Sequence, residues 1–321
     1  MTAKEIQDRQ DKLQKVIDYA TAQKASYKTA EITSKMMGLT SKGAFYDVLK
    51  GAWANVAADV FDRICRQCGA ESGWKIVETA NYQRIKGAML KAANHGDLNA
   101  LCGDTGTGKT KAAKTLSAII PNANYVLSDV TMTKATFLQS ILKGLTPQYY
   151  NYRGLQSQMS AVCDLMSQKT NSVLIIDDAG KLKENILSLV QVIFDRTKGS
   201  AGVLMLGTEG LYQKIAQHSG SNKHFMRELN ARLTWGFLDY VKPNEVHNIC
   251  IENGITDESA ITWLSNATVA LHTLENIIKT AKVVSESMSV TIDSGFLAKM
   301  NQNTTFFKPE SLNFKQRLKV A

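Results

Sequence analysis

Residues 103–110 read Gly103-Asp104-Thr105-Gly106-Thr107-Gly108-Lys109-Thr110 and match the pattern G-x-x-x-x-G-K-[ST] at every position. The preceding residues, 98–102, are mostly apolar and predict a short buried strand. The following residues, 111–120, repeat apolar side chains at helical spacing and predict a helix. The sequence therefore predicts a phosphate-binding loop between a strand and a helix, the context that this motif requires.

The residue types in this loop fit a nucleotide and its metal ion. Gly106 and Gly108 carry no Cβ, so the backbone can curl and point successive N–H groups at a β-phosphate. The helix that begins near Lys109 adds the positive end of its dipole. We expect all eight residues to bind ATP, with Lys109 reaching the β- and γ-phosphates and the Thr110 hydroxyl binding Mg²⁺.

A second informative stretch reads Val173-Leu174-Ile175-Ile176-Asp177-Asp178. Four apolar residues predict a central parallel strand buried on both faces, and such strands carry functional groups at their carboxyl ends. We expect Asp177 to hold Mg²⁺, often through water, and Asp178 to act as the general base that orients the attacking water. Residues 202–208 predict the next core strand, which ends in Thr208, a hydroxyl that can sense the γ-phosphate.

Two arginines share one predicted helix over residues 225–233. Arg227 and Arg232 are both candidates to reach the nucleotide of a neighbouring subunit. The alternative for either arginine is a surface ion pair.

Composition narrows the class of protein. A length of 321 residues predicts about two domains, and the net charge of +9 favours a polyanionic partner. No apolar run approaches the ~18 residues of a membrane span, and the N-terminus lacks the apolar core of a signal peptide, so we expect a cytoplasmic protein with no membrane partner. The odd number of five cysteines argues against a disulfide framework. For Cys65 and Cys68, helix packing is favoured over a zinc or redox role.

The N-terminal part predicts helices. Residues 1–25 predict a helical arm, and residues 26–70 predict a compact helical domain. Within it, a helix over 29–37, a turn with Gly38 and a helix over 42–49 resemble a helix-turn-helix, in which Lys42 and Tyr46 would face DNA. The alternative is a small three-helix bundle that contacts protein.

Further candidate DNA contacts lie in the central and C-terminal parts. Thr131, Thr133 and Lys134 follow a predicted strand at 125–127 and suit phosphate contacts, although a capped loop would have the same composition. Arg153 belongs to an aromatic and basic cluster over 149–153, which could stack on a strand of DNA or pack between helices. Residues 301–321 form a basic tail, which is either a DNA contact or a solvated end.

The ordered set of P-loop, strand ending in Asp177-Asp178, strand followed by Thr208, arginine-bearing helix and small helical region resembles an AAA+ ATPase core with its lid. A closer resemblance, over roughly residues 26–300, is to the target-selection ATPases of DNA transposition, the phage Mu transposition protein B family. Residues 77–79, 102–110, 174–177, 203–207 and 231–233 carry this resemblance.

The resemblance implies an α/β AAA+ P-loop core with a parallel sheet over 74–245, a helical lid over 246–300 and an N-terminal helix-turn-helix domain. It also implies an ATPase that uses ATP and Mg²⁺ and forms a homo-oligomeric filament or ring on double-stranded DNA. Such proteins bind DNA largely without regard to sequence, deliver the target to a transposase or activate it, and disassemble on ATP hydrolysis. In the lid, His272 stands where the family usually has a sensor arginine, and in the acidic pair Asp178 replaces the usual glutamate.

Other functions compete with this one. A helicase loader or replication initiator of the same superfamily would bind a helicase rather than a transposase. A small-molecule kinase would more typically insert an arginine-bearing lid inside the core, whereas this chain places a helical lid after it. A nucleotide-gated scaffold with little turnover is the fourth possibility, because Asp178 and His272 depart from the usual residues.

Overall fold

The computed structural model of this chain describes residues 12–13, 16–17, 42–52, 56–57, 60–61, 64–65, 74–146, 152–217, 224–267 and 270–304. Several predicted features lie outside these residues: the helix over 29–37 and its following turn, the tyrosines at 149 and 150, and the tail from 306 onward. They stay predictions.

The chain divides into two compact units, and each unit contains several segments. The first comprises Met1–Ser72, Arg84–Gly103 and Lys109–Phe237. The second comprises Gly73–Gln83, Asp104–Gly108 and Leu238–Ala321. The middle of the 103–110 loop therefore groups with the C-terminal part of the chain.

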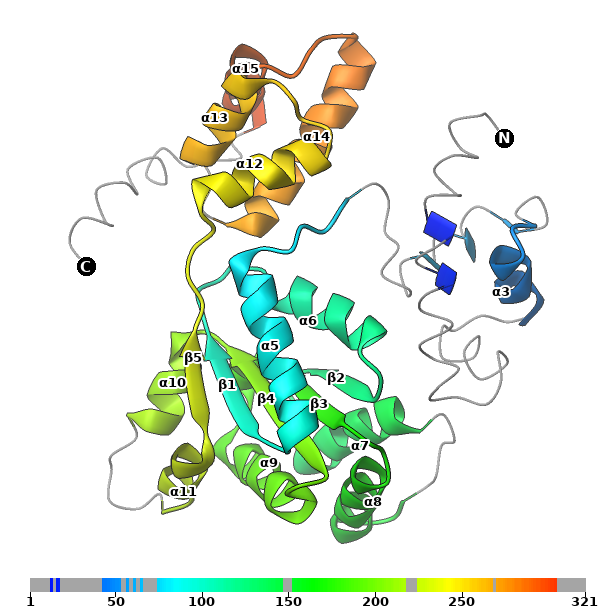
Figure 1. Cartoon of the computed structure of the whole chain (residues 1–321), viewed down its shortest axis with the longest axis vertical. Coiled ribbons are helices and arrows are strands. Elements are labelled where there is room, and N and C mark those ends of the chain that lie inside the picture. The colour runs from blue at the N-terminus through cyan, green and yellow to red at the C-terminus, as the bar shows by residue number, and fades with distance from the viewer. Residues whose placement is uncertain are drawn as a thin grey trace. The chain divides into compact units, whose positions relative to one another are not determined.

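Strands and helices alternate through the central part of the chain, as an α/β fold requires. The elements are α5 (Ala80–His95), β1 (Leu98–Cys102), α6 (Lys109–Ile119), β2 (Ala123–Leu127), α7 (Lys134–Leu145), α8 (Leu155–Ser167), β3 (Ser172–Asp177), the 3₁₀-helix η2 (Ala179–Lys181), α9 (Glu184–Thr197), β4 (Ala201–Gly207), α10 (Glu209–Ala216), α11 (His224–Arg232) and β5 (Thr234–Phe237). The strands form one sheet in the order β2-β3-β4-β1-β5, shown in Figure 1. Every neighbouring pair is parallel.

Burial follows this strand order. Every residue of β1, β3 and β4 is buried, so both faces of these central strands are covered. Among the covering helices, α6 packs against β2 and β3, α8 against β3, and α9 against β4. The predicted buried strands at 98–102, 173–177 and 202–208 are confirmed, except that the last strand ends at Gly207 and Thr208 follows it as the N-cap of α10.

The edge strand β5 has no counterpart in the sequence prediction. It pairs with β1 from Asn99–Thr234 to Cys102–Phe237. Its four residues are only partly covered, so they lack the continuous apolar run that marked the central strands.

The second unit contains a helical bundle of α12 (Pro243–Glu252), α13 (Glu258–Ala267), α14 (Leu271–Met288) and α15 (Ser294–Thr304), labelled in Figure 1. Val246, Ile249, Leu264 and Ile277 belong to its buried apolar core. Residues 74–79 form neither helix nor strand, and Trp74 and Val77 in this segment pack against the core of the bundle.

The N-terminal part has a small core of its own. The predicted helix over 42–49 is confirmed as α3 (Lys42–Leu49), and Phe45 and Val48 on this helix pack with Val56 and Ile64. Tyr46 on the same helix is exposed. Of the cysteines, Cys65 is buried in this cluster, as its packing role predicted.

Across the described ranges, no helix combines the length and apolar character needed to span a membrane.

Two glycines of the first unit give a test of this packing. A Cβ on Gly202 of β4 would lie 2.0 Å from the carbonyl oxygen of Ala92 in α5, whereas one on Gly87 of α5 meets nothing within 4 Å. We expect Gly202→Ala to lower the free energy of unfolding by about 1–3 kcal/mol, because it overpacks a strand–helix contact. Gly87→Ala is the control and should raise it by up to about 1 kcal/mol through helix propensity. Urea unfolding measures both, and equal midpoints for the two variants would contradict the described packing.

Candidate functional site

The carboxyl ends of β1, β3 and β4 meet at one edge of the sheet because the three strands are parallel neighbours. The N–H of Gly103, just after β1, donates to the carbonyl of Gly207 at the end of β4 (3.0 Å). The N–H of Ser128, just after β2, donates to the carbonyl of Asp177 at the end of β3 (2.9 Å). The strand ends predicted to carry chemistry therefore lie along the edge where ligands bind in sheets of this kind.

Lys109 is the first residue of α6, directly after the glycine-rich loop. Its side chain is 7% exposed, and its Nζ donates to the carbonyl of Gly103 (2.7 Å). The ammonium group is therefore held at the loop, where it can exchange this carbonyl for a phosphate oxygen. Thr110 follows in the first turn of the helix and is half-buried.

The middle of the loop needs its glycines. Gly106 and Gly108 both have φ of +88°, a left-handed conformation that favours glycine. Between them, the Thr107 hydroxyl donates to the carbonyl of Asp104 (2.8 Å) and closes the loop on itself. Thr105 is exposed at its tip.

The first residue of helix α14 contacts this loop, and the sequence did not predict this contact. The N–H of Leu271 donates to the carbonyl of Gly106 (2.8 Å), and a Cβ on Gly106 would lie 2.5 Å from the Cβ of Ala270. His272 comes next, is exposed, and has its Nε2 3.2 Å from the amide nitrogen of Asn276. The histidine that replaces the expected arginine thus lies one residue from a contact with the loop.

Asn81 and Tyr240 also hold the loop. The buried Asn81 amide (5% exposed) donates to the carbonyls of Thr107 (3.2 Å) and Asp239 (2.7 Å). The Tyr240 hydroxyl donates to the Asp104 carboxylate, and this bond raises the pKa of Tyr240 above its usual value. Neither residue has a local sequence signal, because each lies far along the chain from the residue that it contacts.

Asp177 is fully buried at the end of β3. Its Oδ1 accepts the N–H of Asp178 (3.0 Å) and its Oδ2 accepts the hydroxyl of Tyr125 on β2 (2.8 Å). Burial, with the neighbouring Asp177 carboxylate, raises the pKa of Tyr125, so its hydroxyl keeps its proton and acts as a donor. The sequence did not identify Tyr125 as part of the site.

Asp178 adopts a left-handed backbone conformation, with φ 53° and ψ 34°. Its Oδ2 accepts a hydrogen bond from Nζ of Lys181, three residues later in η2 (2.7 Å). This hydrogen bond and the charge of Asp178 raise the pKa of Lys181. A candidate general base thus has an ion-pair partner, which it must release to accept a proton.

The donors at this edge of the sheet suit Mg²⁺. The Asp177 carboxylate and the Thr110 hydroxyl are hard oxygen ligands, which Mg²⁺ prefers. The Ser128 hydroxyl is 2% exposed, and no described residue hydrogen-bonds to it, so it could bind a water of the ion's hydration shell. Within the described part of the chain, no three His, Cys, Asp or Glu side chains cluster as a metal cage. Mg²⁺ commonly uses one or two carboxylates together with phosphates and water, so a cage is not required.

Thr208 lies after β4 and is the N-cap residue of α10. It is exposed, and its side chain makes no capping hydrogen bond. Its hydroxyl therefore does not serve the cap of its own helix.

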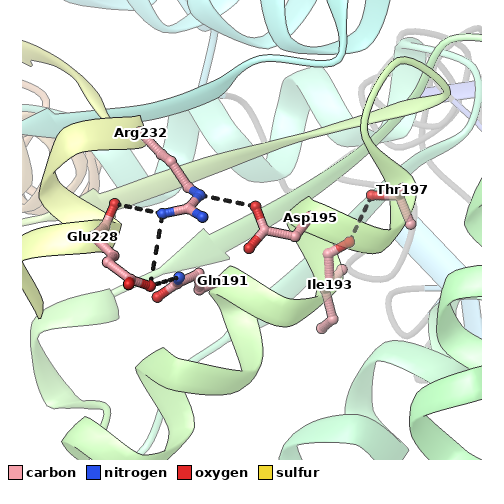
Figure 2. A network of polar contacts seen from close by, with 6 residues as sticks. All are labelled: Gln191, Ile193, Asp195, Thr197, Glu228 and Arg232. Atoms are coloured by element: carbon pink, nitrogen blue, oxygen red, sulfur yellow. Dashed lines mark hydrogen bonds and ion pairs between the residues drawn. The ribbon is translucent and has the colours of Figure 1, made fainter. Parts of the chain in front are cut away.

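Arg232 ends α11 in a network that Figure 2 shows. Its Nε donates to Asp195 of α9 (2.8 Å), and its guanidinium also donates to the carbonyl of Glu228 (3.0 Å). Gln191 of α9 donates to the Glu228 carboxylate (3.0 Å) and completes the link between the two helices. Because the Arg232 and Asp195 side chains are 34% and 40% exposed, water weakens this pair and another anion can replace Asp195.

Arg227, one helical turn and a half earlier, is exposed. No hydrogen bond or ion pair joins its side chain to another described residue. The two candidate arginines therefore differ: Arg232 has partners in its own chain, whereas Arg227 faces solvent.

The candidate DNA contacts at 131–134 form a capped loop. The Thr131 hydroxyl donates to Asp129 (2.7 Å), and the Thr133 hydroxyl accepts the N–H of Thr136 (3.2 Å) as the N-cap of α7. Lys134 is half-buried at the start of α7. These are the contacts of a capped loop, which is the alternative to DNA contact. Both hydroxyls are exposed, and DNA contact stays a prediction.

The remaining candidates lie on other elements. Arg153 is exposed just before α8, and Tyr46 is exposed on α3. Lys42 begins α3.

Comparison with known proteins agrees with this architecture. Residues 92–215 match the family model described as an AAA domain. The crystal structure of Cdc6p from Pyrobaculum aerophilum aligns with a TM-score of 0.54 at 13% identity, over 68% of this chain and 65% of that one. This chain thus spans about two thirds of that protein. The fold of the core is the α/β AAA+ fold.

Two further structures are similar at lower scores. The RuvB Holliday junction branch migration motor of Thermotoga maritima aligns with a TM-score of 0.46 at 16% identity, over 69% of this chain and 68% of that one. AMPPCP-bound DnaA from Aquifex aeolicus aligns with a TM-score of 0.44 at 15% identity, over 65% and 63%. A search of curated proteins finds no significant match. The match to the family model alone identifies residues 92–215 as an AAA-type ATPase domain, an ATP-hydrolysing module.

The Asn81 contacts give a test of how the loop is held. Asn81→Ala leaves the carbonyls of Thr107 and Asp239 without this donor, and we expect it to lower the free energy of unfolding by about 1–3 kcal/mol. Asn248→Ala, an exposed position on α12, is the matched control and should stay within about 0.5 kcal/mol. Urea unfolding followed by circular dichroism compares them. Equal stability of the two variants would show that the Asn81 amide does not hold the loop.

Proposed function

We propose that this chain is an ATPase that assembles on double-stranded DNA in its ATP-bound form and delivers target DNA to a transposase. One observation carries the ATPase part: three strand ends meet at one edge of the sheet. The end of β1 leads into the loop before Lys109, the end of β4 leads to Thr208, and β3 ends in Asp177 with Asp178 directly after it. The DNA and transposase parts rest on the positive charge of the chain and on its resemblance to target-selection ATPases.

Each residue assigned to the site at this sheet edge has a role in the proposed hydrolysis of ATP. The loop residues 103–108 direct backbone N–H groups at the phosphates, and Lys109 exchanges the Gly103 carbonyl for a phosphate oxygen. Thr110 and Asp177 would hold Mg²⁺, and this ion would supply positive charge that offsets the charge of the phosphates. Asp178 leaves Lys181 and accepts a proton from the water that attacks the γ-phosphorus, while the bond to the β-phosphate oxygen breaks and ADP departs.

Thr208 and His272 are the residues that we assign to sensing the γ-phosphate. The Thr208 hydroxyl is free of its helix cap. His272 follows the Leu271 N–H that binds the loop, so a change at Gly106 on nucleotide binding would reach it through one hydrogen bond. A neutral histidine donates a single hydrogen bond, which is weaker support than an arginine fork.

Assembly brings an arginine to the nucleotide of the next subunit. Arg227 has no side-chain hydrogen bond or ion pair to break among the described residues, whereas Arg232 must first exchange Asp195 for phosphate oxygens. Either exchange is feasible, because exposed ion pairs contribute little to stability. Hydrolysis would remove the γ-phosphate that bridges two subunits, and the assembly would then release DNA.

DNA contact is proposed for Lys134, Thr131 and Thr133 on the loop before α7, with Arg153, Lys42 and Tyr46 as further contacts. Only Lys134, Arg153 and Lys42 carry positive charge, so a single subunit would bind weakly. Repetition of these contacts along a filament or ring multiplies the affinity, which makes DNA binding dependent on ATP. Contacts to phosphates carry no sequence information, so binding would be largely independent of sequence.

Electron microscopy of the negatively stained protein tests this proposal. With a slowly hydrolysed ATP analogue and duplex DNA, we expect filaments or rings on the duplex, and we expect Lys109→Ala to abolish them. Arg227→Ala and Arg232→Ala should be compared with each other, because only one of the two arginines is expected to reach the nucleotide of the next subunit. The variant that lacks this arginine should still bind nucleotide but should not assemble. Assembly should also fall steeply with salt, since each phosphate contact releases a counterion.

Two outcomes would contradict the proposal. Closed rings that form but do not bind DNA would favour a helicase loader or initiator of replication. Tight DNA binding at ~0.2 M salt without nucleotide would show that assembly is not what creates the DNA site.

A further inference from the structure

Tyr125 occupies the third position of β2, in register with Ile175 of β3. The residues on either side of it, Asn124 and Val126, are buried, and Tyr125 itself is half-buried on the opposite face of the strand. From there its hydroxyl reaches across to the end of β3 and donates to Asp177 Oδ2 at 2.8 Å. A residue of β2, the strand at the other edge of the sheet from β5, thus contacts the carboxylate assigned to Mg²⁺.

The Asp177 carboxylate is held on both of its oxygens. Oδ1 accepts the N–H of Asp178 at 3.0 Å, and Oδ2 accepts the Tyr125 hydroxyl. The side chain is fully buried, so water cannot replace a missing donor without cost. Two donors on different oxygens fix the plane of the carboxylate, and each oxygen keeps a lone pair for a further partner.

Tyr125 also faces the helix that carries Thr110. Nζ of Lys114 on α6 lies 5.9 Å from the centre of the Tyr125 ring. Lys114 is four residues after Thr110, so the two side chains share one face of α6. The tyrosine therefore lies between the helix and the strand that supply the two candidate Mg²⁺ ligands.

We propose that Tyr125 is a positioning residue for the metal: its hydroxyl orients the Asp177 carboxylate so that the remaining lone pairs face Mg²⁺ or its water. This inference rests on the proposed ATP and Mg²⁺ site. Hydrogen-bonding partners of a metal-binding carboxylate commonly tune the affinity for the metal, and their loss typically costs 10–100-fold. Tyr125 donates its proton throughout and takes no part in the reaction itself.

The test compares nucleotide binding with and without Mg²⁺. A fluorescent, non-hydrolysed ATP analogue is titrated into the 321-residue chain in EDTA and then at increasing Mg²⁺. Tyr125→Phe keeps the ring that packs against α6 and removes only the hydroxyl. We expect its affinity in EDTA to equal that of wild type, while the Mg²⁺ concentration at the midpoint of the metal effect rises about tenfold or more.

Two further variants separate positioning from packing. Tyr212→Phe is the matched control, because Tyr212 packs its ring against Trp235 and Phe237 in the same unit, and its midpoint should equal that of wild type. In an Asp177→Asn background, Tyr125→Phe should have no additional effect, because the carboxylate that it orients is gone.

Three results would overturn the inference: an unchanged midpoint for Tyr125→Phe, an equal loss of affinity in EDTA and in Mg²⁺, or an undiminished effect of the substitution in the Asp177→Asn background. These failures differ from failure of the proposed function, in which wild-type protein itself would not bind the ATP analogue.

Discussion

Three neighbouring parallel strands, β3, β4 and β1, are buried along their whole length, and this burial restricts where polar chemistry can occur. A charged group within these strands would lose its solvation, so charged groups lie where the strands end. Parallel pairing then places those ends along one edge. Gly103, the acidic pair and Thr208 lie along this edge for this reason, although Thr208 comes 105 positions after Gly103 in the sequence.

A second constraint acts on the loop itself. Gly106 has a left-handed backbone and almost no space beside Ala270, so its glycine serves both conformation and close approach. Asn81, Tyr240 and the first N–H of α14 hold the same loop from other parts of the chain. In the proposed function this loop binds the nucleotide, so the residues that hold it are placed to respond to that binding.

The parts that could be predicted from the sequence are those with a local signal. The loop motif has fixed spacing, and the central strands are short apolar runs that end in Asp177 or before Thr208, so their type and place were both predicted. The edge strand β5 gave no such signal, because its residues are half-exposed and its pairing with β1 depends on a segment far away in the chain.

Partners of the site residues were harder to predict than the residues themselves. Tyr125 reads as an ordinary strand tyrosine, and its bond to Asp177 follows only from the register of β2 against β3. The pairing of Arg232 with Asp195 likewise depends on how α11 packs on α9 (Figure 2). Sequence patterns identify which groups carry chemistry, whereas tertiary pairing decides which of them are already engaged.

Phosphate release by the purified chain tests whether this sheet edge hydrolyses ATP. We expect Mg²⁺-dependent turnover in wild-type protein, none in EDTA, and none in Lys109→Ala, which removes the ammonium group held at the loop. Turnover that survives in Lys109→Ala would place the reaction elsewhere in the chain, and turnover that needs no Mg²⁺ would contradict the metal-binding role of Thr110 and Asp177.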